Sequence, residues 1–137
     1  MTTQAVSSGS NIDDYFRLFL VPNMGHCSGS QPPGSDAPWY FSAASQNPGP
    51  ARSGITSGVP STDTEGRQYE YDAILALMRW VEEGKAPERI VATKFKGDNS
   101  TEVVRRGVIC KWPERAVWKG KDDDDAATDV DGWVCEA

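Results

Sequence analysis

Long apolar runs and an excess of positive charge are both missing from this sequence of 137 residues. No segment approaches the roughly 20 apolar residues that span a bilayer, and the N-terminal stretch MTTQAVSSGSNIDD lacks the charged and apolar regions of a secretory signal. Fourteen Lys and Arg oppose twenty Asp and Glu, so the net charge is −6. Such a field repels nucleic-acid phosphates and anionic lipids. Neither a nucleic acid nor a membrane is therefore expected as a partner.

Apolar residues are also scarce, and the cysteines are odd in number. Hydrophobic residues make up 38% of the chain, while 13 Gly and 9 Pro add little to a core. A single domain with a small core, or part of a larger core, is therefore expected. Three cysteines cannot all pair internally, so one needs an outside partner or stays a free thiol. Cys110, Cys135 and the glycosylation sequon at Asn99 indicate a secretory history, which disagrees with the missing signal peptide.

The first half of the chain reads as one strand followed by a long loop. Residues 14–21, DYFRLFLV, predict a buried strand, because a continuous apolar run suits a sheet covered on both faces, as in α/β proteins. Residues 28–67 are rich in Gly, Pro and Ser and predict a loop, in which PWYF at 38–41 is an anchored patch. A loop of this length is commonly functional or disordered.

The second half predicts one helix and several short strands. Ile74, Leu77, Met78 and Val81 follow the i, i+3, i+4, i+7 spacing of a helix face within residues 68–83. Gly84 provides a C-cap with positive φ. Short strands are expected at residues 89–95, 103–110 and 116–118, with a turn over residues 96–100.

His26, the one histidine, directly follows the predicted strand. α/β enzymes place catalytic groups in such loops at the ends of inner strands, so His26 is a candidate general base. The alternative is a loop histidine that is hydrogen-bonded to backbone. Catalysis would also need a nucleophile and a carboxylate that fixes the tautomer, and local spacing supplies neither.

The sequence gives little support for a serine nucleophile, a cysteine nucleophile or a calcium site. No G-x-S-x-G elbow occurs, and Ser28 stands one place too late for one. Cys27 as a nucleophile is disfavoured, because adjacent side chains on an extended backbone point apart, so a disulfide role is preferred. The acidic stretch 122–131, with Asp129 and Asp131, faintly resembles a calcium loop but lacks the later Glu, which favours a solvated loop.

The sequence resembles the C-terminal portion of the tannase and feruloyl esterase family of serine esterases. The motifs that support this are DYFRLFLVPNMGHCSGS, PWYF, YDAILALMRWVEEGKAPERIVATK and VICKWPERAVWKGK. The most specific are the strand leading into Gly25-His26-Cys27 and the segment 80–93, and the resemblance runs from about residue 13 onward. Asn23 stands where the family usually has glycine, which leaves open the backbone conformation before His26.

The resemblance implies a C-terminal fragment of an α/β-hydrolase with a Ser-Asp-His triad. In that fold the triad follows the chain order Ser, Asp, His, so His26 is the expected catalytic residue, while the serine and the acid would lie upstream. It also implies a pair Cys110–Cys135, and an upstream partner for Cys27. The expected parts of this one domain, 1–137, are a leader (1–13), strand and histidine loop (14–27), long loop (28–67), helix (68–84) and C-terminal strands with a disulfide brace (89–137).

Two hypotheses follow from these expectations. The first is a carboxylic ester hydrolase acting on small feruloyl or galloyl esters, secreted as the full-length protein, with this chain inactive alone. No metal and no cofactor is expected in this chain, because the structural calcium often found in the family belongs to its lid. The second is a non-catalytic remnant that binds a partner through the helix at 72–80. Under the first hypothesis the apolar faces of 14–21 and of the helix would be exposed in this chain, because their neighbours would lie upstream.

Overall fold

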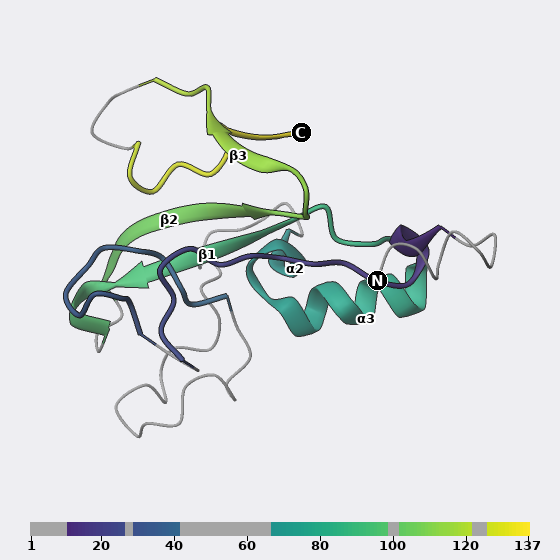
Figure 1. Ribbon diagram of the computed structural model, residues 1–137, viewed down its shortest axis with the longest axis horizontal. Coiled ribbons are helices and arrows are strands. Elements are labelled where there is room, and N and C mark those ends of the chain that lie inside the picture. Colours follow the sequence, from purple (N-terminus) through teal and green to yellow (C-terminus); the bar gives the residue numbers. More distant parts are fainter. Residues whose placement is uncertain (1–10, 27–28, 42–66, 99–101, 122–125) are drawn as a thin grey trace.

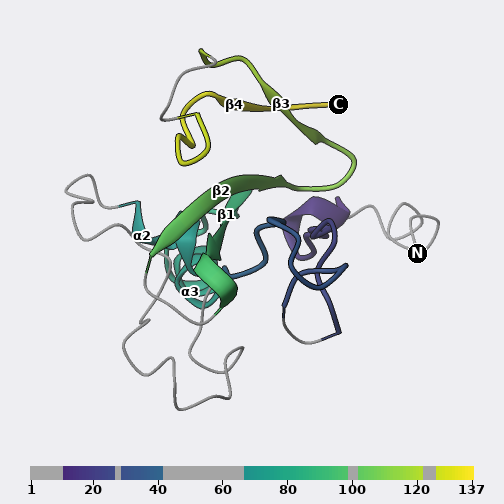
Figure 2. The ribbon, with the colours of Figure 1, turned by 90° about the vertical axis from the view of Figure 1, so that its left-hand side faces the viewer.

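A computed structural model describes residues 11–26, 29–41, 67–98, 102–121 and 126–137 (Figure 1). Its regular elements are two short sheets, two consecutive helices and short 3-10 turns. Figures 1 and 2 show the β1–β2 sheet in the middle, with α2 and α3 on one side and the C-terminal strands on the other. The expected sequence of strand, helix and further strands is therefore only partly realised.

The first sheet is an antiparallel pair, and six of the seven residues of its first strand are buried. β1 (Arg89–Phe95) pairs with β2 (Val103–Cys110), with Val91 opposite Val108 and an irregularity between Lys94 and Phe95. Both strands match the predicted ranges, because Val, Ile and Thr favour a pleated surface that is covered. The expected turn after β1 begins as a 3-10 turn at Lys96–Asp98.

The second sheet pairs β3 (Arg115–Trp118) with β4 (Trp133–Glu136), again antiparallel. β3 begins one residue before the predicted strand at 116–118. Trp118 and Trp133 meet edge to face with ring centroids 5.3 Å apart, which adds to the stabilisation of this small ribbon. A bond between Cys110 and Cys135 joins the end of β2 to β4.

The predicted helix at 68–83 is interrupted by its own capping residue. α2 (Gln68–Tyr71) ends at Asp72, whose extended backbone (φ −139°, ψ 109°) starts α3 (Ala73–Glu83). The Asp72 carboxylate accepts hydrogen bonds from the amides of Ile74 and Leu75 at 2.9 and 3.2 Å. An aspartate that caps amides two or three residues on starts a helix rather than continuing one. Gly84 ends α3 with φ 69°, as predicted.

Two clusters of buried side chains form the core of the described part. The larger lies between α2, the β1–β2 sheet and the C-terminal loop; the smaller is aromatic and joins the PWYF patch to the end of β1. Their buried members are Tyr71, Val91, Val108, Cys110 and Val130 in the first, and Trp39, Tyr40 and Phe95 in the second. Trp39 and Tyr40 are 1% and 0% exposed, so the predicted anchored patch is confirmed. Residues 42–66 of the predicted loop lie outside the described part.

The predicted buried strand at 14–21 is wrong for this chain. The segment begins as a 3-10 turn at Ile12–Asp14 and continues as extended chain with one isolated bridge, Phe19 to Lys111. Tyr15 is 59% and Leu20 55% exposed. Among the described residues, backbone contacts join this segment to Lys111 and Trp112, just after β2, and Arg17 pairs with Glu88. These contacts do not cover both faces, which an apolar run needs. The expectation that the apolar side chains of residues 14–21 would be exposed in this chain is confirmed.

Candidate active site around His26

His26 lies at the exposed tip of a tight hairpin formed by residues on either side of it. The Gly25 amide donates to the Gly29 carbonyl at 2.8 Å, and the Gln31 amide donates to the Asn23 carbonyl at 2.7 Å. Met24 and Ser30 face each other across the hairpin as an antiparallel bridge. The imidazole is exposed, so it can be reached by a group outside these residues.

Asn23 provides the backbone conformation that the hairpin needs at its start. Its φ of 57° lies in the left-handed region, where it is the one non-glycine among the described residues. Asparagine tolerates this region better than most side chains do. The structure thereby explains how this chain manages with Asn where the resemblance leads one to expect glycine.

Two side chains connect the hairpin to the body of the molecule. Met24 packs against the aromatic cluster of Trp39, Tyr40 and Phe95. Ser30, which is buried, accepts a hydrogen bond from the Lys94 ammonium at 2.7 Å and donates one to the Ala37 carbonyl at 2.9 Å. Sequence reasoning missed both Ser30 and Lys94. The one signal in the sequence was a lysine between Thr93 and Phe95 in an otherwise mostly apolar predicted strand.

A mostly apolar groove of about 660 Å³ begins beside the hairpin and extends over the β1–β2 sheet. Its lining includes Pro22 and Asn23 from the start of the hairpin, and Trp112 and Trp133 from the C-terminal part of the chain. Apolar grooves of this size accommodate small ligands or apolar parts of another chain. The groove and the imidazole therefore lie on neighbouring parts of the surface.

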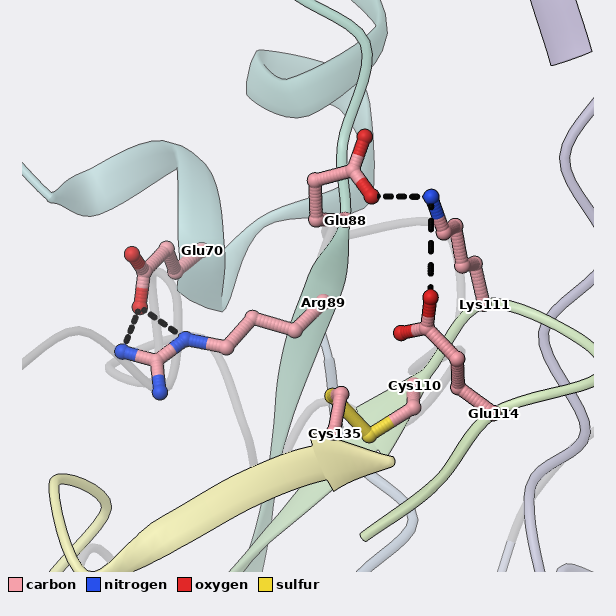
Figure 3. The surroundings of a disulfide bond; sticks show 7 residues. All are labelled: Glu70, Glu88, Arg89, Cys110, Lys111, Glu114 and Cys135. Atoms are coloured by element: carbon pink, nitrogen blue, oxygen red, sulfur yellow. Dashed lines mark hydrogen bonds and ion pairs between the residues drawn. A yellow bond between two sulfur atoms is a disulfide. The ribbon is translucent and has the colours of Figure 1, made fainter. Parts of the chain in front are cut away.

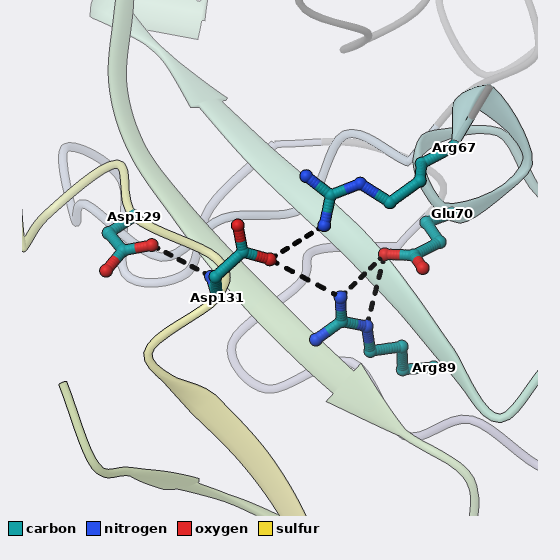
Figure 4. Close-up of polar contacts among 5 residues, drawn as sticks. All are labelled: Arg67, Glu70, Arg89, Asp129 and Asp131. Atoms are coloured by element: carbon teal, nitrogen blue, oxygen red, sulfur yellow. Dashed lines mark hydrogen bonds and ion pairs between the residues drawn. The ribbon is translucent and has the colours of Figure 1, made fainter. Parts of the chain in front are cut away.

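Asp131, the last acid of the stretch considered for calcium, pairs with arginines in the structure. The Asp131 carboxylate accepts a hydrogen bond from Arg67 at 2.7 Å and lies 3.8 Å from Arg89, while Asp129 accepts from the Asp131 amide at 2.8 Å (Figure 4). The Arg67 hydrogen bond, opposed by partial burial, holds the pKa of Asp131 below its ordinary value. Within the described ranges, no three His, Cys, Asp or Glu side chains gather as a metal site would require. Residues 122–125 lie outside them.

The expected pairing of Cys110 with Cys135 is confirmed, with Cα atoms 5.7 Å apart. Figure 3 shows this disulfide between two ion-pair groups, one formed by Arg89 with Glu70 and the other by Lys111 with Glu88 and Glu114. Together these contacts fix the ends of β1, β2 and β4. Cys27, Ser28 and Asn99 lie outside the described residues, so their expected roles stay predictions.

A sequence model of the family described as "Tannase and feruloyl esterase" matches residues 2–132. The chain belongs to this family. It is 32% identical over 134 residues to a protein of Xanthomonas campestris pv. campestris named as an "Uncharacterized esterase", a match that covers 97% of this chain and 19% of that protein. A Neosartorya fischeri protein named "Probable feruloyl esterase B-2" is 31% identical over 124 residues, covering 90% of this chain and 19% of its own length.

Solved structures agree with the family at the level of the fold. An esterase from Aspergillus oryzae superposes with a TM-score of 0.64 at 24% identity, over 96% of this chain and 22% of that chain. Feruloyl esterase B from the same organism gives 0.60 at 24% identity and the same coverage. The chain thus spans about a fifth of the length of the curated relatives it matches. Helices and antiparallel strands are consistent with part of an α/β fold. In the described ranges, no helix combines the length and apolarity needed to cross a membrane.

Proposed function

We propose that this chain is the histidine-bearing, C-terminal part of the catalytic domain of a serine-type carboxylic ester hydrolase with an α/β-hydrolase fold. The observation that carries the proposal is the exposed imidazole of His26 on a tight, anchored hairpin in a chain of the tannase and feruloyl esterase family. The names of the relatives favour small phenolic esters, feruloyl or galloyl, as substrates.

His26 acts as the proton carrier in this proposal. It takes the proton from a serine hydroxyl as the serine oxygen attacks the ester carbonyl, and it returns that proton to the departing alcohol. It then takes a proton from the water that attacks the acyl-serine, and gives it back to the serine when the acid leaves. The serine, the acid that orients the imidazole and the oxyanion-hole donors belong to the rest of the domain. This chain alone is therefore inactive and needs no cofactor of its own.

Cys27 fits the same proposal through its position next to His26. A disulfide from Cys27 to a cysteine near the serine would hold nucleophile and base together. Such a bond forms in oxidising compartments, which favours secretion of the full-length protein. The pair Cys110–Cys135 points to the same compartment.

The test is hydrolysis of methyl ferulate, methyl gallate and a nitrophenyl ester, by this chain alone and by the chain joined to the remaining part of a family enzyme. We expect no turnover alone, and turnover in the joined protein that His26→Ala lowers by several orders of magnitude. Gln31→Ala, a change of an exposed side chain on the same hairpin, is the matched control and should retain activity. Activity of the chain alone that depends on His26 would contradict the proposal.

A second candidate function is a partner-binding module without catalysis. α3 leaves a broad apolar surface exposed, which an interaction surface would also do. Its exposed apolar side chains are Ile74, Leu75, Leu77, Met78 and Val81. Genomic sequence upstream distinguishes the two candidates: an in-frame nucleophile elbow with a cysteine before its serine supports the esterase, and its absence supports the binding module.

A further inference from the structure

Lys94 and Ser30 form a buried polar contact directly beneath the His26 hairpin. Each residue is 4% exposed, and the Lys94 ammonium donates to the Ser30 hydroxyl oxygen at 2.7 Å. Lys94 belongs to β1, the most buried strand, and Ser30 belongs to the hairpin, 64 positions away in sequence. The contact therefore ties the hairpin to the central sheet.

The direction of the hydrogen bonds shows what this pair can do. A serine and a lysine at this distance can form a nucleophile and its base, but that requires the hydroxyl to donate to the amine. Here the one hydroxyl hydrogen of Ser30 goes to the Ala37 carbonyl at 2.9 Å, and its oxygen accepts from Lys94. The pair is thus a clamp between the hairpin, β1 and the segment that leads to the PWYF patch.

Ser30 sits where a clamp controls the position of His26. It faces Met24 across the hairpin, between the two backbone hydrogen bonds donated by Gly25 and Gln31. A shift of Ser30 therefore moves both strands of the hairpin, and the imidazole at the tip moves with them. Met24 holds the other strand only by apolar packing, which fixes distance less sharply than a hydrogen bond to a charged group.

The energetic cost of the clamp argues for a positioning role. A buried ammonium is expensive to desolvate, and an apolar side chain of similar size is often tolerated or stabilising in its place. The Lys94–Ser30 contact joins one loop to β1, so its effect is expected at that loop. We propose that Lys94, acting through Ser30, is a positioning residue for His26; its catalytic consequence rests on the proposed function, whereas its effect on the hairpin does not.

The experiment uses the intact chain and its single histidine. Hydrogen exchange at the Gly25 and Gln31 amides is measured by NMR. The ring nitrogen signals of His26 are recorded as well, and they need no assignment because the chain has one histidine. The variants are Lys94→Met and Ser30→Ala. The matched control is Lys111→Met, a lysine with a 19% exposed side chain that pairs with Glu88 and Glu114 at the end of the sheet away from the hairpin.

We expect exchange at Gly25 and Gln31 to accelerate about tenfold or more in Lys94→Met and Ser30→Ala, while Ile90 and Ile109, which pair across the sheet, keep their protection. The His26 ring signals shift in both variants, and Lys111→Met leaves the hairpin amides and the ring signals as they are. Lys94→Arg, which keeps a cationic donor, restores part of the protection.

Unchanged hairpin exchange and ring signals in a folded Lys94→Met protein would overturn the proposal. If Lys94→Met does not fold, the same readings on Ser30→Ala decide, since that change removes only one oxygen. In the joined enzyme Lys94→Met should lower kcat about tenfold with little change in KM. If His26→Ala does not lower the activity of the joined enzyme, the proposed function is overturned. The effect of Lys94 on the hairpin would still stand, because exchange and ring signals measure it independently.

Discussion

Asn23 shows how one backbone angle prepares the candidate site. Its φ of 57° is favoured by glycine, tolerated by asparagine and disfavoured by β-branched residues. We expect Asn23→Gly to keep the hairpin and Asn23→Val to destabilise it by about 1–2 kcal/mol. Hydrogen exchange at the Gln31 amide, which bonds to the Asn23 carbonyl, measures this directly. Equal exchange in the two variants would show that the left-handed conformation is not required.

Asp131 links stability to pH at the residue scale. Its pKa is lowered, first by the Arg67 hydrogen bond, so its ionised form stabilises the fold above the ordinary carboxyl range near pH 4. That contribution is lost as the pH falls through the lowered pKa. We expect Asp131→Asn to be less stable than the parent at pH 7, with the difference shrinking as the pH falls below about 4. It should also shrink in high salt, because the side chain is 65% exposed.

Urea unfolding at pH 7, 4 and 2 measures the Asp131 effect. Glu82→Gln, an exposed carboxylate on α3, is the control and should leave the pH profile as it is. A constant difference between Asp131→Asn and the parent at all three pH values would contradict the assignment to this ion pair.

α3 sets behaviour at the scale of the element. Only Ala76 of its residues is buried, whereas Leu77 is 52% and Val81 77% exposed. An exposed apolar face of this width drives association. We expect the chain to self-associate at micromolar concentration, and the double change Leu77→Glu and Val81→Lys to reduce this several-fold. The new pair stands at i,i+4 with the acid first, which supports the helix.

Sedimentation velocity with circular dichroism checks the α3 prediction. Glu82→Lys with Lys85→Glu exchanges two exposed charges and keeps every apolar side chain and the net charge, so it is the control and should leave association unchanged. A parent chain that stays monomeric would contradict the prediction, as would a double variant that associates as strongly as the parent.

The disulfide organises the described part of the molecule as a whole. Cys110 and Cys135 close a loop with a sequence separation of 25 and join the two sheets. A loop of this length stabilises by about 3–4 kcal/mol in the chain-entropy model. We expect reduction, or the double change to alanine, to remove about this much from the free energy of unfolding and to release β3 and β4 first. Urea unfolding and hydrogen exchange measure the two effects.

Cys27 provides the control for the disulfide. Cys27→Ser should leave the stability unchanged, and peptide mapping of unreduced protein should find Cys27 as a free thiol or in a disulfide-linked dimer. A bond from Cys27 to Cys110 or Cys135 would contradict both the pairing and the family-based expectation for Cys27.

The sequence by itself determined the elements whose signals are local. β1 and β2 follow from runs of residues that favour strands, and the end of α3 follows from Gly84, because backbone geometry at that position depends on the absence of a side chain. The anchored PWYF patch and the Cys110–Cys135 pair were also predictable, the second through the resemblance. His26 could be identified as a candidate from its position after the apolar run alone.

Tertiary structure decided what depends on neighbours distant in sequence. The apolar run at 14–21 reads as a buried strand, but the described residues give it too few partners, so it remains largely exposed. Asp72 could continue or cap a helix; in the folded chain it caps α3, and the adjacent Ala73 amide donates to the distant Phe41 carbonyl at 3.1 Å. The clamp of Lys94 on Ser30 joins positions 64 residues apart, and no local pattern specifies such a contact, because burial and hydrogen-bond geometry arise only when the chain folds.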